Sequence, residues 1–90
     1  HSITPFLLWR AAEQLRLYLN QESIPVKLLG SGRGWDYQHD NYSHYAGDDK
    51  DLMSILPNIK CFWPETVADL PAVTKEWLYN GQPSYLNLRR

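Results

Sequence analysis

Side chains able to do chemistry are concentrated in one stretch, between residues 30 and 49. The stretch opens with the glycine-rich run Gly30-Ser31-Gly32-Arg33-Gly34. The polar side chains of most interest in it are His39, Asp40, His44, Asp48 and Asp49. Because imidazole gains and loses a proton near neutral pH, each histidine is a candidate proton donor or anion ligand.

Three functional interpretations of this stretch remain open beside that of a plain surface loop. The glycines could let backbone N–H groups approach an anion, although the spacing fits neither a P-loop nor a dinucleotide fingerprint. The histidines and aspartates have the side-chain types of a Zn or Mn site, but their spacing matches no established motif. In the third interpretation, one histidine and neighbouring hydroxyls cover a ligand that is held elsewhere, as a proton donor or anion contact.

Composition excludes several classes of protein. A chain of 90 residues is one small domain or part of one. Its net charge of -1 provides no basic surface for nucleic acid. The longest apolar run, Phe6–Trp9, is far shorter than the roughly 20 residues of a membrane span. Cys61 has no partner for an internal disulfide, so we expect a reducing, cytoplasmic location.

Aromatic residues make up 13% of the chain, which is much for so small a domain. A chain of this size buries only about 60–65% of its unfolded surface. Some of the rings are therefore expected to line a binding surface, or to pack against a part that lies outside these residues.

Hydrophobic periodicity and turn residues predict three helices and three strands in alternation. The predicted elements, in order, are a helix over about 5–20, a strand at 26–29, a helix over 48–56, a strand at 59–63, a helix over 66–79 and a strand at 84–88. Thr4 and Pro5 are suited to the first helix start, where Thr4 could act as the cap. Pro71 should kink the last helix or delay its start.

This order predicts an α/β fold with a parallel sheet of about three strands flanked by helices, in the order α-β-loop-α-β-α-β. Three strands are few, and no strand precedes the first helix. We therefore interpret residues 1–90 as a single partial domain, the incomplete half of a larger three-layer fold.

The connection from Ser31 to Gly47 is too long to be a simple link. At roughly 17 residues it far exceeds the usual connections of such folds, which are about 2–6 residues. Four aromatic residues in it argue against disorder. It leaves the carboxyl end of a strand, where open parallel sheets bind ligands.

Several motifs occur in an order that resembles a known family. They are Thr4-Pro5-Phe6-Leu7-Leu8-x-Arg10-Ala11, Ile24-Pro25-Val26-Lys27-Leu28-Leu29-Gly30-Ser31-Gly32, Ser43-His44-Tyr45-Ala46-x-Asp48-Asp49, Leu52-Met53, Leu56-Pro57-Asn58, Pro64-x-Thr66 and Pro83-x-Tyr85-Leu86-x-Leu88. Together they look like the C-terminal half of the pyrimidine-binding domain of thiamine-diphosphate enzymes of the transketolase and deoxyxylulose-phosphate synthase type. The resemblance covers nearly all of the chain.

The resemblance implies roles for four residues. Phe6 falls where the family stacks a ring on the cofactor's aminopyrimidine, so it is the expected cofactor-binding residue. Arg10 falls near an arginine that contacts substrate anions, although Trp9 could occupy that position instead. Ser43-His44 resembles a Thr-His pair, in which the histidine hydrogen-bonds substrate oxygens near the reacting carbon. His44 is thus the expected catalytic residue, and Arg10 and Ser43 the expected substrate-binding residues.

Some positions depart from the family pattern or are expected to be structural. Tyr45 stands where the family often has a second histidine, and Asp40-Asn41-Tyr42 where it often has Asp-Gly-Pro. We expect Asp48-Asp49 to be charges at a helix start, Cys61 to be an inert core thiol and Trp63 to be a packing residue.

The resemblance also implies partners. Cofactor and Mg²⁺, bound only in the full assembly, are expected to need a diphosphate-binding domain from the rest of the chain or from a complementary subunit, in a homodimer. The glutamate that the family uses to activate the cofactor lies upstream of the matching segment, so no turnover is expected from these residues alone. No metal site, nucleic acid or membrane is expected here. The alternative is a non-catalytic module that binds a partner protein or small ligand.

Overall fold

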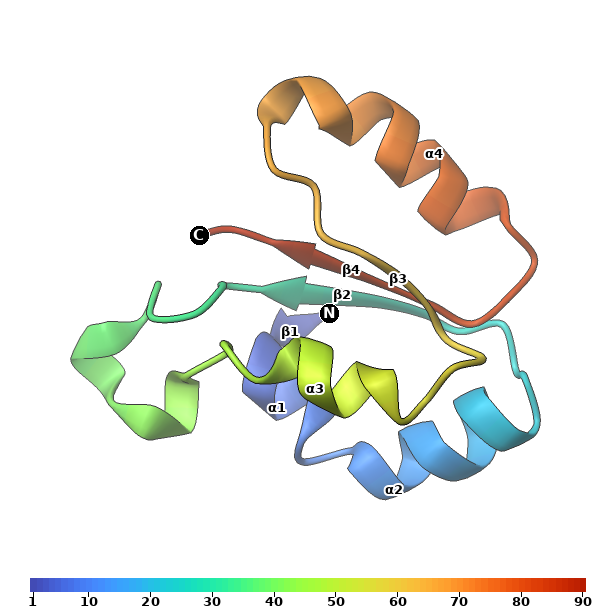
Figure 1. The fold of residues 1–90 in the computed structure, drawn as a ribbon, viewed down its shortest axis with the longest axis horizontal. Coiled ribbons are helices and arrows are strands. Elements are labelled where there is room, and N and C mark those ends of the chain that lie inside the picture. Colours follow the sequence, from blue (N-terminus) through green and yellow to red (C-terminus); the bar gives the residue numbers. More distant parts are fainter.

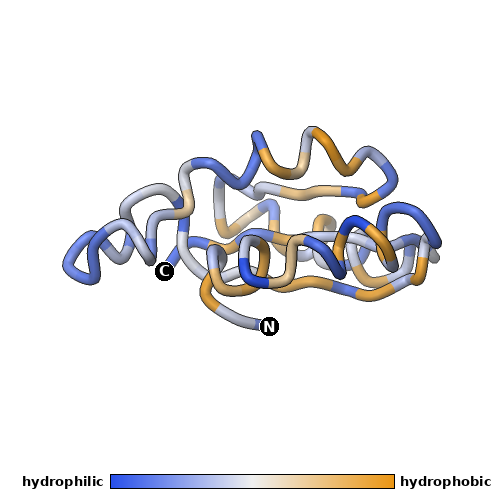
Figure 2. The backbone as a smooth tube through the Cα atoms, turned by 90° about the horizontal axis from the view of Figure 1, so that it is seen from below, coloured by the Kyte–Doolittle hydropathy of each residue, from blue (hydrophilic) through white to orange (hydrophobic).

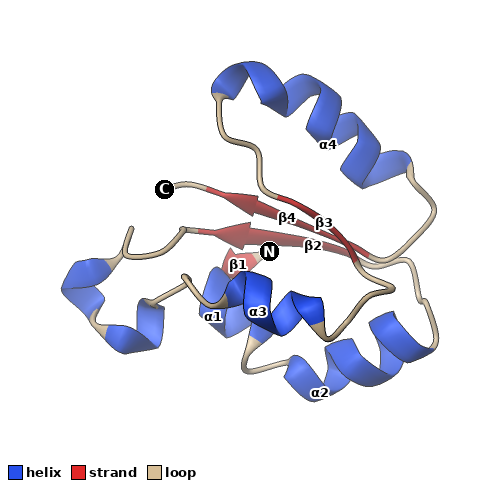
Figure 3. Ribbon diagram, in the orientation of Figure 1, coloured by secondary structure: helices blue, strands red, loops and turns tan.

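The computed structural model describes residues 1–90 as a parallel sheet with helices on both faces (Figures 1 and 3). The strands lie in the order β1-β2-β4-β3 and are all parallel. Their bounds are Ser2–Ile3 for β1, Lys27–Ser31 for β2, Lys60–Phe62 for β3 and Ser84–Leu88 for β4. The predicted α/β class is confirmed.

The prediction that no strand precedes the first helix was wrong, and the sheet has four strands instead of three. The additional strand, β1, contains two residues and pairs with Gly30 and Ser31 of β2. Two residues are too few to produce the alternation by which a strand is recognised in a sequence. β1 is identified as a strand only by its pairing with β2.

Helices α1 (Thr4–Leu8), α2 (Ala12–Gln14) and α3 (Asp49–Ser54) lie on one face of the sheet, and α4 (Leu70–Tyr79) lies on the other (Figure 1). A π-helix over Leu15–Gln21 continues from α2. None of these helices combines the length and the apolar character that crossing a lipid bilayer requires.

The single helix predicted over residues 5–20 is in fact broken between α1 and α2. The chain turns at residues 9–11, where Ala11 has φ -112° and ψ 16°. Contacts outside the helix accompany the break, because the Trp9 indole donates a hydrogen bond to Asp48, 3.1 Å away. Leu8, Leu15 and Leu19 stay buried on either side of it. The spacing of apolar residues therefore predicted which side chains are buried, but it did not predict that the helix is interrupted.

The prediction that Thr4 caps α1 was also wrong. Ile3 occupies the cap position, and no side chain caps the helix. The Thr4 hydroxyl instead donates to the backbone oxygens of the β2 end, Gly32 O at 3.0 Å and Ser31 O at 3.2 Å. At the other end of the chain, Thr66 and Asp69 form a capping box, and Pro71 lies in the first turn of α4. The delayed start expected from Pro71 is confirmed.

The hydrophobic core lies between the sheet and the layer formed by α1, the π-helix and α3. Its buried residues are Leu8, Leu15, Leu19, Leu28, Leu52, Met53, Leu56, Ile59 and Tyr85. Side chains alternate along β4, so Tyr85 and Asn87 point toward this core. Ser84 lies on the opposite side, where its hydroxyl bonds to the backbone oxygen of Trp77 in α4.

The long connection between β2 and α3 leaves the carboxyl end of β2, as predicted, and extends beyond the end of the sheet (Figures 1 and 2). It contains two short 3-10 turns, Gln38–Asp40 and Tyr42–His44. Because β1 and β2 are parallel, the start of α1 and the start of this loop lie at the same end of the sheet. The loop and the helix are thus placed to form one site.

Candidate functional site

The loop between β2 and α3 folds back over the first turn of α1 and forms a pocket with it. The pocket has a volume of about 510 Å³ and is open to solvent. Its lining residues are Pro5, Phe6, Trp9, Arg10, Tyr42, Ser43, Tyr45 and Asp48. Helix and loop each contribute half of the wall, so neither element makes the pocket by itself.

The aromatic ring of Phe6 is central to this pocket. Its centroid lies 4.8 Å from that of the His44 imidazole, and the two planes are inclined by 70°, an edge-to-face arrangement. The guanidinium carbon of Arg10 lies 3.9 Å from the Phe6 centroid, at cation–π distance. One half-buried ring therefore has an imidazole at one side and a cation over one face.

Ser43 and His44 are joined directly. The Ser43 hydroxyl lies 2.9 Å from Nδ1 of His44, and Ser43 Oγ also donates to the backbone oxygen of Asp40 at 3.3 Å. The bond at Nδ1 leaves Nε2 of the imidazole without a partner within the chain. This nitrogen is the one available to donate or accept a proton from a bound molecule.

The four residues that the sequence singled out, Phe6, Arg10, Ser43 and His44, are thus brought together by the fold. Trp9, the alternative to Arg10, also lines the pocket, but its indole N–H is engaged by Asp48. Arg10 keeps an exposed guanidinium with no ion pair. Of the two, Arg10 is the one able to bind an anion.

The loop is stiffened by stacked aromatic rings in place of a hydrophobic core. Tyr42 and Tyr45 stack with centroids 5.3 Å apart and planes 16° from parallel. Trp35 packs on Tyr45 at 4.5 Å. These rings hold the segment on either side of Ser43-His44, so the aromatic content has a structural use here.

The metal-site interpretation of this loop finds no support in the geometry. No three His, Cys, Asp or Glu side chains in residues 1–90 gather as a group that could hold a metal ion. His39 faces Asp40, with Nε2 3.2 Å from Oδ2, and both side chains are exposed. His44 faces Phe6 instead.

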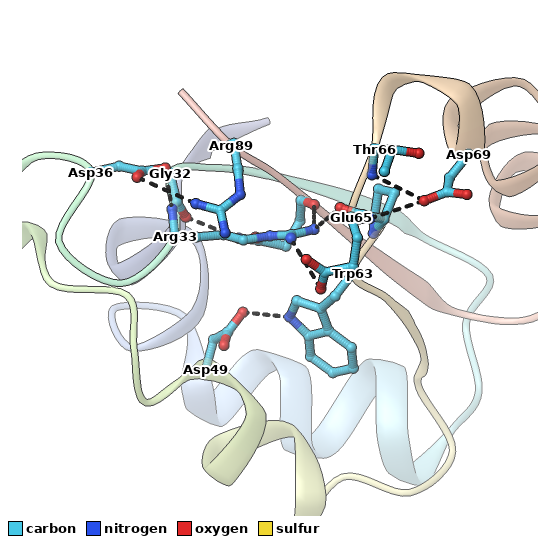
Figure 4. Close-up of polar contacts among 11 residues, drawn as sticks. Gly32, Arg33, Asp36, Asp49, Trp63, Glu65, Thr66, Asp69 and Arg89 are labelled. Carbon is cyan, nitrogen blue, oxygen red and sulfur yellow. Dashed lines mark hydrogen bonds and ion pairs between the residues drawn. The ribbon is translucent and has the colours of Figure 1, made fainter.

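Asp49 proves to be more than a charge at a helix start. Its side chain is buried, and one oxygen, Oδ2, accepts a hydrogen bond from the indole of Trp63 at 2.8 Å (Figure 4). The same oxygen accepts a hydrogen bond from the hydroxyl of Tyr85 at 2.9 Å. Burial and then the Asp49 charge raise the pKa of Tyr85, so its hydroxyl stays a donor. Asp49 therefore ties α3 to the ends of β3 and β4.

Arg33 is a second anchor that sequence reasoning did not identify. Its Nε donates to Oδ1 of Asn87 at 2.6 Å, and its terminal nitrogen donates to the backbone oxygens of Pro64 at 2.6 Å and Asn87 at 3.0 Å. An ion pair to Glu65, at 3.6 Å, completes its surroundings (Figure 4). Nothing local distinguishes Arg33 from a surface arginine, since its partners lie 31 and 54 positions away.

The pocket suits one end of the cofactor that the resemblance implies. Aromatic walls and a half-buried ring fit a flat heteroaromatic group, because offset rings attract each other. The same residues do not fit a metal-bound diphosphate, since the chain gathers no carboxylate cluster. Any diphosphate-binding groups would have to come from another domain.

Comparison with known proteins agrees with this geometry. No protein-family model matches the chain. The chain is 28% identical over all 90 residues to the 6-deoxy-6-sulfo-D-fructose transketolase subunit SqwH of Clostridium sp. (strain MSTE9). A solved structure, described as a split-gene transketolase in an inactive beta4 tetramer, superposes with a TM-score of 0.81 at 29% identity over 99% of the chain.

In both comparisons the chain spans 28% of the other protein's length. The alignments cover 99% or more of the chain, and the chain is similar to these proteins in both sequence and fold. The resemblance found in the motifs is therefore confirmed, and the chain is homologous to a segment of transketolase subunits.

Proposed function

We propose that this chain supplies the aminopyrimidine and substrate side of the active site in a thiamine-diphosphate-dependent, transketolase-like enzyme. The whole enzyme transfers two-carbon ketol units between sugar phosphates or related ketol donors. The observation that carries the proposal is the convergence of Phe6 and His44, whose ring centroids lie 4.8 Å apart at the carboxyl end of the sheet.

Phe6 and His44 have distinct roles in this proposal. Phe6 stacks on the aminopyrimidine, for which an offset aromatic contact is suited. His44, held by Ser43 at Nδ1, presents Nε2 to a substrate oxygen and can hold or release a proton there. The cofactor, when bound, supplies carbanion stabilisation, whereas the protein binds and orients.

The substrate of this site carries an anionic group. The Arg10 guanidinium is exposed beside the pocket and has no acidic partner, so it can form charge-assisted hydrogen bonds to anionic oxygens. The SqwH relative is named for a sulfonated sugar, and the family resemblance suggests sugar phosphates. Both offer the same kind of oxygen to a guanidinium.

A second domain must complete the site. The proposed partner is a diphosphate-binding domain, in the remainder of this chain or in a complementary subunit, within a homodimeric assembly in the cytoplasm. The split-gene transketolase among the similar structures is described as inactive in a tetramer of its beta subunit. That description is consistent with a need for a second, complementary subunit to complete the active site.

Calorimetric titration with thiamine diphosphate and Mg²⁺ tests the proposal on the full protein together with any complementary subunit. Phe6→Ala should weaken cofactor binding by about tenfold, the size of a lost aromatic stack. Tyr79→Ala is the control, because Tyr79 is 77% exposed on α4, far from the pocket in the fold. Unchanged binding by Phe6→Ala would remove Phe6 from the site. Failure of the wild-type assembly to bind the cofactor would favour a non-catalytic module.

A further inference from the structure

One buried hydrogen-bonded network connects the helix that carries Phe6 to the loop that carries His44. We refer to Thr4, Arg33, Asp49, Tyr85 and Asn87 as the Asn87 network. Thr4, Tyr85 and Asn87 are at most 1% exposed, and Asp49 is 6% exposed. None of its five residues lines the pocket.

Asn87 is the branching point. Its Nδ2 lies 2.9 Å from the Thr4 hydroxyl, 3.0 Å from the backbone oxygen of Gly32 and 3.0 Å from the Tyr85 hydroxyl. Its Oδ1 accepts from Arg33 at 2.6 Å, which fixes the orientation of the amide. A single side chain thus contacts the start of α1, the start of the loop and, through Tyr85, the start of α3.

Beyond the bond that Asn87 accepts from Arg33, the hydrogen bonds of this network are donated outward from the Asn87 amide nitrogen. The amide donates to Tyr85, whose hydroxyl donates to Asp49, and the amide also donates to Thr4, whose hydroxyl donates to Gly32. Every buried hydroxyl is satisfied both as donor and as acceptor. A fully satisfied buried network fixes one arrangement, because any displacement leaves a polar group without a partner.

The backbone is shaped to admit this network. A Cβ on Gly30 would lie 2.8 Å from the Thr4 hydroxyl and 3.0 Å from the Tyr85 ring. Only glycine at this position of β2 lets both side chains approach the sheet so closely. Thr4 and Tyr85 consequently pack directly against the backbone of β2 at Gly30.

We propose that Asn87 and Thr4 are positioning residues, which set the separation of Phe6 and His44 by joining α1 to the loop and to α3. Phe6 follows Thr4 by half a helical turn, and His44 lies between the two anchored ends of the loop, Arg33 and Asp49. This inference rests on the proposed function only for its effect on turnover. The geometric effect is independent of it.

Thr4→Val and Thr4→Ser form the test pair in the full protein. Valine keeps the shape of threonine but removes the hydroxyl, whereas serine keeps the hydroxyl. Histidine labelled with ¹³C at Cε1 reports the position of His44 by NMR, because the Phe6 ring shifts the signal of a proton lying close to it. Thr74→Val, on the exposed side of α4, is the control for the substitution itself.

In Thr4→Val we expect the His44 signal to move toward that of an unshielded histidine, and Thr4→Ser to restore the wild-type position. If ketol transfer is the activity, Thr4→Val should lower kcat by about tenfold to a hundredfold, the effect of misplacing a catalytic group by about 1 Å. An unmoved His44 signal in Thr4→Val overturns the positioning role, whatever the activity. A moved signal in a protein without ketol transfer keeps the positioning role and rejects the proposed function.

Tyr85→Phe provides a second variant if Thr4→Val fails to fold. It removes only the hydroxyl that links Asn87 to Asp49, and it keeps the buried ring. We expect the His44 signal to move in this variant as well. An unmoved signal in Tyr85→Phe would equally contradict the proposal.

Discussion

The guanidinium carbon of Arg10 lies 3.9 Å from the centre of the Phe6 ring, so the cation covers one face of the ring proposed to stack on the cofactor. The two residues lie one helical turn apart, across the end of α1. Arg10 therefore shields one face of the ring and lies beside the space where an anion would enter the pocket.

We expect Arg10→Gln to raise KM for an anionic sugar substrate by about tenfold to a hundredfold, the loss typical of a charged hydrogen bond. The value of kcat should change less, because the guanidinium binds the anion and lies apart from the proton-holding Nε2. Arg16→Gln is the control, since Arg16 lies beyond the helix break and pairs with Glu13 at 2.7 Å. Steady-state kinetics of the full enzyme check this. An equal effect of both substitutions would show that Arg10 has no special role.

His44→Gln should lower kcat/KM by about a hundredfold or more, as expected when a proton-handling imidazole is lost. The same loop offers a matched control. His39 pairs with Asp40 and its side chain is 59% exposed, so His39→Gln should leave the kinetics unchanged. If His39→Gln were the more damaging substitution, the assignment of His44 would be reversed.

Cys61 should react very slowly with alkylating reagents near neutral pH. Burial, reinforced by the charge of Asp49, raises the pKa of this thiol to about 12, and the thiolate is the reactive form. Timed iodoacetamide labelling, followed by mass spectrometry of the peptide that contains Cys61, measures the rate. The rate should keep rising with pH well above 9. The urea-unfolded protein is the reference, and equal rates in the folded and unfolded states would contradict the prediction.

Asp36 should contribute to stability at neutral pH and lose that contribution in acid. Burial alone would raise the pKa of this carboxyl, but hydrogen bonds from the backbone N–H groups of Arg33 and Arg90, with the charges of Arg89 and Arg33, lower it below 3.8. The contribution is therefore present above the unfolded value and disappears as pH falls through the lower folded value.

Asp36→Asn should accordingly lower the urea midpoint at pH 7 and have a shrinking effect as the pH falls below about 4. Glu22→Gln, at an exposed position after the π-helix, is the control and should change the midpoint little at either pH. A difference between wild type and Asp36→Asn that grew in acid would contradict the sign of the effect.

The sequence predicted the bounds of an element well where those bounds depend on residues that are close together in the sequence. The strand at 84–88 has the predicted bounds. Thr66 caps the 3-10 turn Val67–Asp69 that leads into α4, and Pro71 lies in the first turn of α4, because capping and proline geometry act within a few residues. The break after Leu8 was missed; the contact that accompanies it, from Trp9 to Asp48, joins residues 39 positions apart and leaves no local signal.

The residues of the candidate site also fall into those that the sequence predicted and those that it did not. Phe6, Arg10, Ser43 and His44 were found through motifs, and the fold brings the first three to one pocket and His44 against the Phe6 ring. Asn87 and Arg33 were not found, because an asparagine in a strand and an arginine after glycine have no periodicity that reveals buried partners. Asp49 was interpreted as a helix-start charge, since its partners Trp63 and Tyr85 are distant in sequence.

The hydrogen bond between Asn87 and Thr4 joins positions 83 residues apart. During synthesis on the ribosome, Asn87 is added 83 residues after Thr4, so α1 emerges before the amide that helps to hold it has been made. The contact between helix and loop is therefore completed only after translation has passed Asn87, and it closes a long loop of the chain. A nascent chain halted before this residue would hold both halves of the pocket without the means to align them.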